Sequence, residues 1–153
     1  MHPIIRYWRR IHALPGGSWL FDRLFGLYIP YTGSMGSRIQ AMEPGYARVE
    51  LPDRRRVRNH LRSIHAIALA NLAELTGNLA MVCALPRDAR LIVAGLSIEY
   101  LKKARGRIVA ESRCPIPPDN QRREYEIPVT LRNGEGDVVA RATIRSLVGP
   151  QRD

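Results

Sequence analysis

The sequence has few cysteines and few histidines, and this shortage argues against a metal site. Its 153 residues include two cysteines and four histidines. Cys83 and Cys114 lie far apart and match no CxxC or CxxH spacing, so we expect no bound metal. Isolated cysteines are also typical of a reducing compartment, so we expect a cytoplasmic protein in which Cys83 is a buried free thiol.

Acidic residues are scarce relative to basic ones. The chain has 24 Lys and Arg against 14 Asp and Glu, which gives a net charge of +10. This charge favours an anionic partner, whether nucleic acid, an anionic membrane face or a phosphorylated small molecule. The basic residues do not interleave with aromatic ones and no recognition-helix pattern is present, so we expect no nucleic-acid partner.

Long apolar runs are missing with one exception, the segment NHLRSIHAIALANLAELTGNLAMVCAL at residues 59–85. From Ala66 onward it is apolar on nearly every face, which is typical of a helix buried on all sides. In a bilayer, Glu74 near its middle would cost about 2.5–3.5 kcal/mol. We therefore expect the dry central helix of a soluble protein, with no stable membrane insertion.

Residues 1–35 predict a helical arm that precedes the main domain. Apolar residues recur at helical spacing over residues 4–11, and the proline and glycines of residues 15–17 end this helix. Residues 27–36, LYIPYTGSMG, contain proline and glycine, so we expect an irregular segment. No acid precedes Asp22, which also suits a basic presequence or a membrane-surface helix. We favour an arm packed on the domain.

Residues 36–150 predict a single domain of the α+β class. A hairpin is expected over residues 37–52, with its turn at Glu43–Gly45. Four segments in which apolar and polar residues alternate follow the helix, at residues 91–101, 107–113, 123–132 and 137–148. Because one sheet cannot cover a helix on all sides, we expect a curved sheet completed by the arm or by a second subunit.

This order of elements resembles the hotdog fold, in which a curved antiparallel sheet wraps one long helix. The spacing of Asn59, His65 and Glu74 is similar to that of acyl-CoA thioesterases of the phenylacetate-degradation (PaaI-like) type. In that family an Asn precedes a His-Gly-Gly turn, and an acid follows a Leu-Ala pair, here Leu72-Ala73. The resemblance continues through LSIEYLKKARGRIVAESRC and GDVVARATI and covers roughly residues 36–148.

The chain departs from that family at two places. Ala66-Ile67 stands where the family has Gly-Gly, and residues 91–93 offer no hydroxyl where family members often place Ser or Thr. A backbone N–H survives a change from Gly to Ala, so the first departure keeps the donor. Together they keep open a second hypothesis, a non-catalytic protein that binds acyl groups or acyl-CoA on the same fold.

The resemblance implies a thioesterase that hydrolyses acyl-CoA, with coenzyme A as part of the substrate and no separate cofactor. Glu74 would act as general base or nucleophile, and the Ala66 N–H at the positive end of the helix would bind the oxyanion. Asn59 would orient water or the carbonyl group, and His65 would be a turn residue beside the substrate. Alternatives left open are a Glu74 that serves only assembly and an Asn59 that only caps the loop.

Two basic segments are expected to hold the phosphates of coenzyme A, because guanidinium forks and ammonium groups bind phosphate well. A solvated surface is the alternative for each of these side chains. Their members are Arg54, Arg55, Arg56, Arg58, Lys102, Lys103 and Arg105.

The resemblance also implies a homodimer or homotetramer whose active sites are shared between subunits. Helix geometry agrees, because Glu74 lies more than two turns after Ala66, roughly 12–13 Å at 1.5 Å per residue. One helix cannot easily bring both residues to a single thioester carbon. We therefore expect Asn59 and Ala66 from one protomer and Glu74 from its neighbour.

Overall fold

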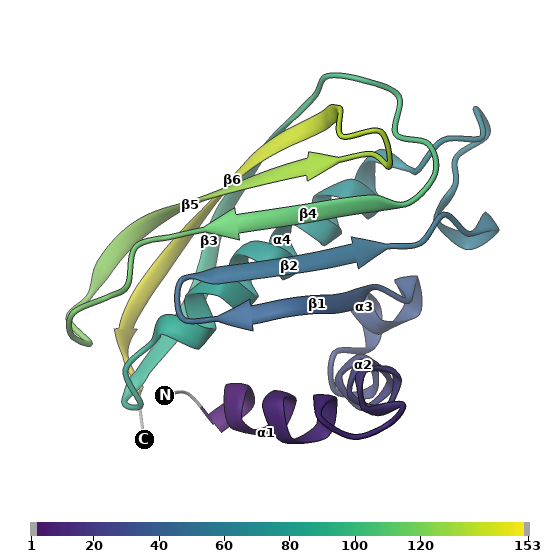
Figure 1. The fold of residues 1–153 in the computed structure, drawn as a ribbon. Helices are drawn as coiled ribbons and strands as arrows, with labels where there is room; N and C mark the ends of the chain where they lie inside the picture. Colours follow the sequence, from purple (N-terminus) through teal and green to yellow (C-terminus); the bar gives the residue numbers. More distant parts are fainter. Residues whose placement is uncertain (1–2, 152–153) are drawn as a thin grey trace.

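The apolar segment of the sequence forms one long helix that packs on a single antiparallel sheet (Figure 1). The computed structural model describes residues 3–151. Its helices are α1 (Pro3–His12), α2 (Gly17–Tyr28), α3 (Pro30–Met35), the short 3₁₀ helix η1 (Arg55–Val57) and α4 (Ala66–Ala84). Its strands are β1 (Arg38–Glu43), β2 (Tyr46–Leu51), β3 (Ala89–Tyr100), β4 (Ile108–Arg113), β5 (Arg123–Arg132) and β6 (Val138–Pro150).

The sheet contains six strands in the order β1-β2-β4-β5-β6-β3, and every neighbouring pair is antiparallel. Helix α4 contacts all six strands, and the sheet curves around it (Figure 1). The predicted hairpin and the four later strands are therefore confirmed, and the chain has the hotdog fold. The two edges of the sheet are β1, which lies beside the N-terminal helices, and β3.

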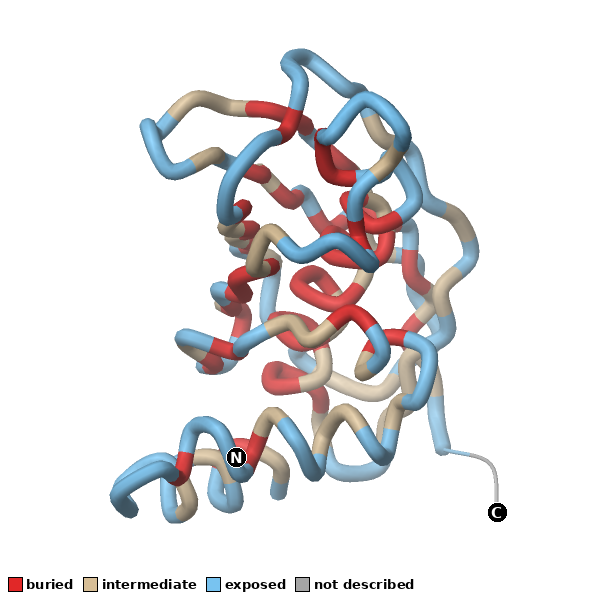
Figure 2. Tube along the Cα trace, turned by 90° about the vertical axis from the view of Figure 1, so that its right-hand side faces the viewer, coloured by how far each residue is buried: buried red, intermediate tan, exposed pale blue. Residues whose placement is uncertain are grey.

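The core lies between α4 and the sheet, as the buried segments around the helix in Figure 2 show. Alternating residues of β5 and β6 point inward, and Ile127 and Ile144 are fully buried there. Helix and sheet approach closely at Gly77, where a Cβ atom would lie 3.0 Å from Ile144 Cγ1. The absent side chain at Gly77 thus lets α4 sit deep in the curve of the sheet.

Helix α4 has the length and composition of a membrane span, with a mean hydropathy of 1.4 over its most apolar window. However, 67% of that window is buried inside the fold, against the sheet. Leu72 and Met81 are completely inaccessible to solvent. This is the burial typical of the core helix of a fold.

The expectation of an irregular segment at residues 27–36 is wrong. The structure continues α2 to Tyr28 and forms α3 directly afterwards, with Pro30 in the first helical turn, where its missing N–H costs nothing. The glycines of this segment serve packing, because a Cβ atom on Gly33 would overlap the carbonyl oxygen of Gly26. Proline and glycine here start a helix and join two helices, so they do not break the structure.

The N-terminal helices pack on the sheet edge and on α4. Both α1 and α2 contact β1, and Ile5 of α1 is fully buried. The buried Asn71 Nδ2 of α4 donates a hydrogen bond of 3.2 Å to Thr32 Oγ1 of α3. The arm therefore contributes both apolar and polar contacts to the core.

We predict that Gly33→Ala lowers the free energy of unfolding by about 1–3 kcal/mol, the usual cost of overpacking. The added methyl group would collide with the Gly26 carbonyl and push α3 away from α2. Urea unfolding measures the change. The control is Gly134→Ala, because a Cβ atom there meets nothing closer than 3.9 Å, and its effect should stay within about 0.5 kcal/mol. Equal stability of the two variants would contradict the close contact.

Candidate active site at the start of the central helix

His65 caps the N-terminus of α4. Its backbone is extended and its Nδ1 atom accepts a hydrogen bond of 3.1 Å from the N–H of Ile67. The His65 N–H donates in turn to the carbonyl oxygen of Val57 in η1, at 2.8 Å. This ring nitrogen therefore acts as the side-chain acceptor that caps the helix. Its structural role is to fix where the helix begins.

The Ala66 N–H is an open donor at the positive end of the helix. The first N–H groups of a helix have no acceptor within it, and the cap satisfies the one of Ile67. Ala66 is exposed, and its N–H has no hydrogen-bond partner within residues 3–151. An exposed, unpaired N–H at this end of a helix is suited to bind an anionic oxygen.

Asn59 precedes this donor in a tight loop and uses its amide oxygen to hold that loop. Oδ1 accepts hydrogen bonds from the N–H of Leu61 at 2.9 Å and from the N–H and hydroxyl of Ser63, each at 3.2 Å. Its Nδ2 group donates no hydrogen bond within the described chain. The loop-capping role and a role toward a ligand use different atoms, so Asn59 can serve both.

Glu74 is only half-buried, so the expectation of a dry carboxylate is wrong for the single protomer. It forms no hydrogen bond or ion pair with any other residue that the structure describes. The physical reason is that the sheet covers α4 on one side and leaves a stripe on the other. Exposed or half-buried residues recur along this stripe at helical spacing, and they are Ala66, Ile67, Ala70, Glu74, Asn78 and Val82. Glu74 thus lies in the middle of an uncovered helix face that begins at the Ala66 N–H.

Tyr100, at the end of β3, belongs to the same region and was missed in the sequence. Its hydroxyl donates a hydrogen bond of 3.0 Å to the carbonyl oxygen of Ala66. In the sequence Tyr100 is one position of an alternating strand, and its proximity to the helix start follows only from the curvature of β3. The contact ties the end of the edge strand to the first residue of α4.

The structure brings the two predicted basic segments side by side. One oxygen of the Asp53 carboxylate accepts from Arg58 Nε at 2.6 Å and the other accepts from the Gly106 N–H at 3.0 Å. The N–H of Ile64 adds a bond of 2.8 Å to the Ala104 carbonyl oxygen. The hydrogen bond from Arg58 holds the pKa of Asp53 below its usual value. Asp53 therefore fastens the loop before α4 to the turn after β3.

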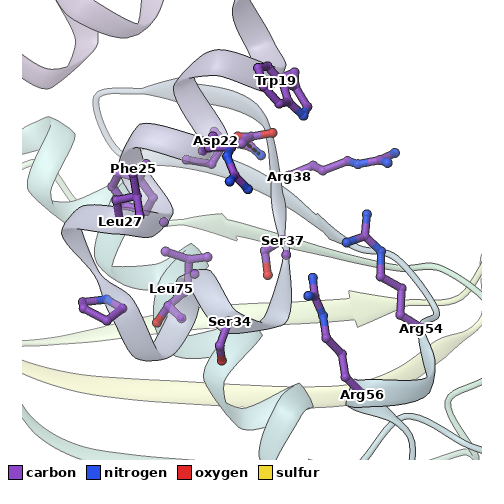
Figure 3. A pocket seen from close by; sticks show the side chains of 17 residues that line it. Trp19, Asp22, Phe25, Leu27, Ser34, Ser37, Arg38, Arg54, Arg56 and Leu75 are labelled. Atoms are coloured by element: carbon purple, nitrogen blue, oxygen red, sulfur yellow. Dashed lines mark hydrogen bonds between the residues drawn. The ribbon is translucent and has the colours of Figure 1, made fainter.

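The side chains of these basic segments nevertheless separate into different surroundings. Arg54 and Arg56 line a cavity of about 640 Å³ beside α2, α3 and β1 (Figure 3). A second cavity, of about 700 Å³, lies at the turn after β3, where Lys102 is also paired with Asp137 at 3.0 Å. Arg58 is engaged by Asp53, and Arg55 lines neither cavity. The second cavity includes Lys102, Lys103 and Arg105.

The cysteines take no part in this site. Cys83 is a free, buried thiol as expected, and burial raises its pKa to about 12. Burial raises the pKa of the free thiol of Cys114 to about 11. Thiols with these pKa values carry almost no thiolate at neutral pH, so neither is suited to nucleophilic attack. No group of three His, Cys, Asp or Glu side chains within residues 3–151 is arranged to hold a metal ion.

Comparisons with known proteins agree with the fold and extend the match into the arm. The model of a family described as a domain of unknown function (DUF4442) matches residues 17–148, which include α2 and α3. The sequence resemblance had left these residues outside. The chain has no match among curated proteins.

Solved structures share the hotdog fold over nearly the whole chain. A crystal structure described only as a genomics target is 29% identical, with a TM-score of 0.82 over 95% of this chain and 97% of that one. A protein of unknown function from Pseudomonas aeruginosa, described as a probable thioesterase, is 26% identical, with a TM-score of 0.78 over 90% and 97% of the two chains. A thioesterase family protein from Silicibacter pomeroyi is 16% identical, with a TM-score of 0.73 over 85% and 96%.

Proposed function

The chain belongs to the DUF4442 family and to the hotdog thioesterase superfamily, and from this membership we propose that it hydrolyses acyl-CoA thioesters to a free acid and coenzyme A. The observation that carries the proposal is the unpaired Ala66 N–H at the capped start of α4, preceded by the braced amide of Asn59. The name of the Pseudomonas relative as a probable thioesterase supports the reaction class.

The start of α4 stabilises the charge that develops during attack on the thioester. When a nucleophile adds to the carbonyl carbon, the carbonyl oxygen becomes an oxyanion, and the Ala66 N–H and the helix dipole favour that charge. The Nδ2 group of Asn59 orients the carbonyl or the attacking water. Because His65 and Asn59 hold this loop through hydrogen bonds of their own, the donors need little rearrangement when the substrate arrives.

Glu74 supplies the base. Its carboxylate takes a proton from water as the water oxygen bonds to the carbonyl carbon, and collapse of the tetrahedral intermediate breaks the C–S bond and releases the thiolate of coenzyme A, which then takes up a proton. Direct attack by Glu74 would instead form an anhydride that water hydrolyses in a second step. In both routes the carboxylate must reach the carbonyl carbon held near Ala66.

A second protomer brings Glu74 to that position. The uncovered stripe of α4 lacks a partner within the described chain, and β3 ends the sheet with an unpaired edge of 12 residues. Apolar side chains are exposed along this edge, with Ile92 at 47% and Leu96 at 38%. Such an edge is a template for another strand. We propose a homodimer or a larger homo-oligomer in which two protomers meet at β3 and α4 and share their active sites.

Coenzyme A enters as part of the substrate, and no separate cofactor is proposed. Its phosphates meet the two basic segments that Asp53 fastens together, and this binding weakens as ionic strength rises.

A non-catalytic acyl-CoA binding protein is the second candidate. It is favoured by the Ile67 side chain, which is 56% exposed at the position of the second glycine of the related thioesterases and narrows the approach to the Ala66 N–H. Residues 91–93 also supply no hydroxyl group. Such a protein would bind acyl-CoA tightly and release no coenzyme A.

We predict that Glu74→Gln leaves the fold intact and lowers kcat by at least ~10², the low end of general-base contributions. The amide keeps the size of the side chain and removes its basicity. Glu126→Gln is the matched control, because Glu126 is exposed on β5 and has no side-chain partner in the described chain. Turnover of Glu74→Gln within a few-fold of the unmodified protein would remove Glu74 from the catalytic role.

We also predict that two inactive variants restore activity when their subunits mix. In a dimer of Asn59→Ala with Glu74→Ala, one site carries both lesions and the other carries none. Random exchange at equal amounts makes half of the dimers mixed, so activity should return to roughly a quarter of the unmodified level under two-fold symmetry.

Subunit exchange must first be shown separately, for example by energy transfer between labelled chains. If exchange is complete and activity stays at the level of the variants alone, each active site lies within one chain. That result would contradict the shared site. The role of Glu74 itself would still be tested by the kcat of Glu74→Gln.

A further inference from the structure

The cavity beside the N-terminal helices is a second site with a chemical character of its own. We call it the arm cavity, and it lies between α2, α3, β1 and residues 54–56 (Figure 3). Its volume of about 640 Å³ is within the range of small-molecule sites, roughly 300–1,000 Å³. Trp19, Phe25, Leu27 and Leu75 form apolar parts of its lining, and arginines form another.

Two guanidinium groups converge at the arm cavity. Gly36 has a φ of 69°, and a Cβ atom there would lie 2.8 Å from Arg54 Nη1 and would overlap Arg56 Nη2. Neither arginine side chain has an acidic or hydrogen-bonding partner within residues 3–151. Like charges this close repel each other, and an anion between them would convert repulsion into two charge-assisted hydrogen bonds. The arrangement therefore suits an anion bound between the two guanidinium groups.

The rest of the lining strengthens this positive field. Arg23 and Arg38 also line the cavity, and Asp22 is the one acid of its lining among the described residues. Asp22 Oδ1 accepts a hydrogen bond of 3.1 Å from the Ile39 N–H, and burial raises the pKa of this carboxyl group. Arg38 Nη1 lies 3.7 Å from Glu50 Oε1 of the neighbouring strand. The other three arginines of the lining, Arg23, Arg54 and Arg56, have no paired carboxylate in the described chain.

Ser37 provides a neutral donor in the same place. Its Oγ atom is buried and has no hydrogen-bond partner among residues 3–151, and Ser37 lines the cavity. A buried hydroxyl group without a partner is costly, so rotation of the Ser37 side chain toward the cavity, where the hydroxyl can donate to a ligand oxygen, would relieve it. Two guanidinium forks and one hydroxyl match the three terminal oxygens of a phosphate monoester better than the two oxygens of a carboxylate.

We propose that the arm cavity binds a phosphate monoester attached to an apolar or aromatic group. Arg54, Arg56 and Ser37 hold the phosphate, and Trp19 and Leu27 cover the attached group. Two sources carry this chemistry, the 3′-phosphate of coenzyme A beside its adenine and the headgroup of a phosphatidic acid. The first source rests on the proposed function, and the second does not.

The arm cavity is linked through the chain to the start of α4. Arg56 immediately precedes Val57, and the Val57 carbonyl oxygen accepts the His65 N–H at 2.8 Å. A ligand bound to Arg56 is therefore one residue away from Val57, whose carbonyl oxygen anchors the start of α4.

Calorimetric titration of the full chain tests the proposal with four probes: coenzyme A, dephospho-CoA, adenosine 3′,5′-bisphosphate and dioctanoyl phosphatidic acid. We expect at least one monoester to bind, and Arg54→Ala/Arg56→Ala to weaken it at least ~10-fold. Ser37→Ala should weaken it less while leaving both charges in place. The matched control is Arg9→Ala/Arg10→Ala, which removes the same charge from exposed positions of α1.

The probes distinguish the two sources. Tighter binding of coenzyme A than of dephospho-CoA assigns the site to the nucleotide. Tighter binding of phosphatidic acid than of coenzyme A assigns it to a lipid. Calorimetry measures binding and does not require hydrolysis. A protein that binds a phosphate monoester but does not hydrolyse acyl-CoA would therefore contradict the proposed function and still support the arm cavity as a binding site.

Three results would overturn the proposal. The first is that no monoester binds. The second is an equal loss of affinity in the control variant, which would indicate bulk charge. The third is loss of binding in Lys103→Ala/Arg105→Ala with none in Arg54→Ala/Arg56→Ala, which would place the phosphate at the turn after β3. Thermal unfolding of each variant, matched to the unmodified protein, shows that the fold is retained, and Ser37→Ala provides the readout if the arginine variant unfolds.

Discussion

The packing of α4 against one curved sheet is the constraint on which the rest of the structure depends. The sheet contacts the helix through all six strands, and Gly77 lets the two approach closely. This fixes the helix axis, while the His65 cap and its bond to Val57 fix where the helix begins. Because the helix axis and the helix start are both fixed, the unpaired Ala66 N–H is also held in a fixed position.

The same packing leaves one face of α4 uncovered in the single protomer. A sheet covers one side of a helix, and the face that carries Ile67, Glu74 and Val82 remains open. Burying this face and the edge of β3 in one contact would remove apolar surface from water and pair the free backbone groups of the strand. Assembly and catalysis would then have a common physical cause, since the contact that covers the helix also delivers the carboxylate.

Much of the fold was predictable, because it depends on patterns that the chain shows locally. The all-round apolar character of residues 66–84 indicated the central helix, and alternation indicated the strands. The segment at residues 27–36 was predicted wrongly, because Gly33 packs against Gly26 and this contact exists only when two helices meet. The sequence shows which residues such a segment contains, but it does not show which helix packs against them.

The site residues named from the sequence stay predictions, and their surroundings became visible only in the structure. The spacing of Asn59, His65 and Glu74 identified the region, yet an apolar sequence could not show that Glu74 lies on the open face of α4. The division of the basic residues also required the structure. Arg58 and Arg56 are two positions apart, and one is held by Asp53 while the other lines the arm cavity.

Release of free coenzyme A from a panel of acyl-CoA esters tests most directly whether the start of α4 is a catalytic site. The panel should span short, long and aromatic acyl groups, with binding of each ester measured in parallel. A thioesterase would hydrolyse at least one ester with saturable kinetics and release one thiol for each acid formed. Tight binding of the esters without release of thiol would contradict catalysis and identify the protein as an acyl-CoA binder.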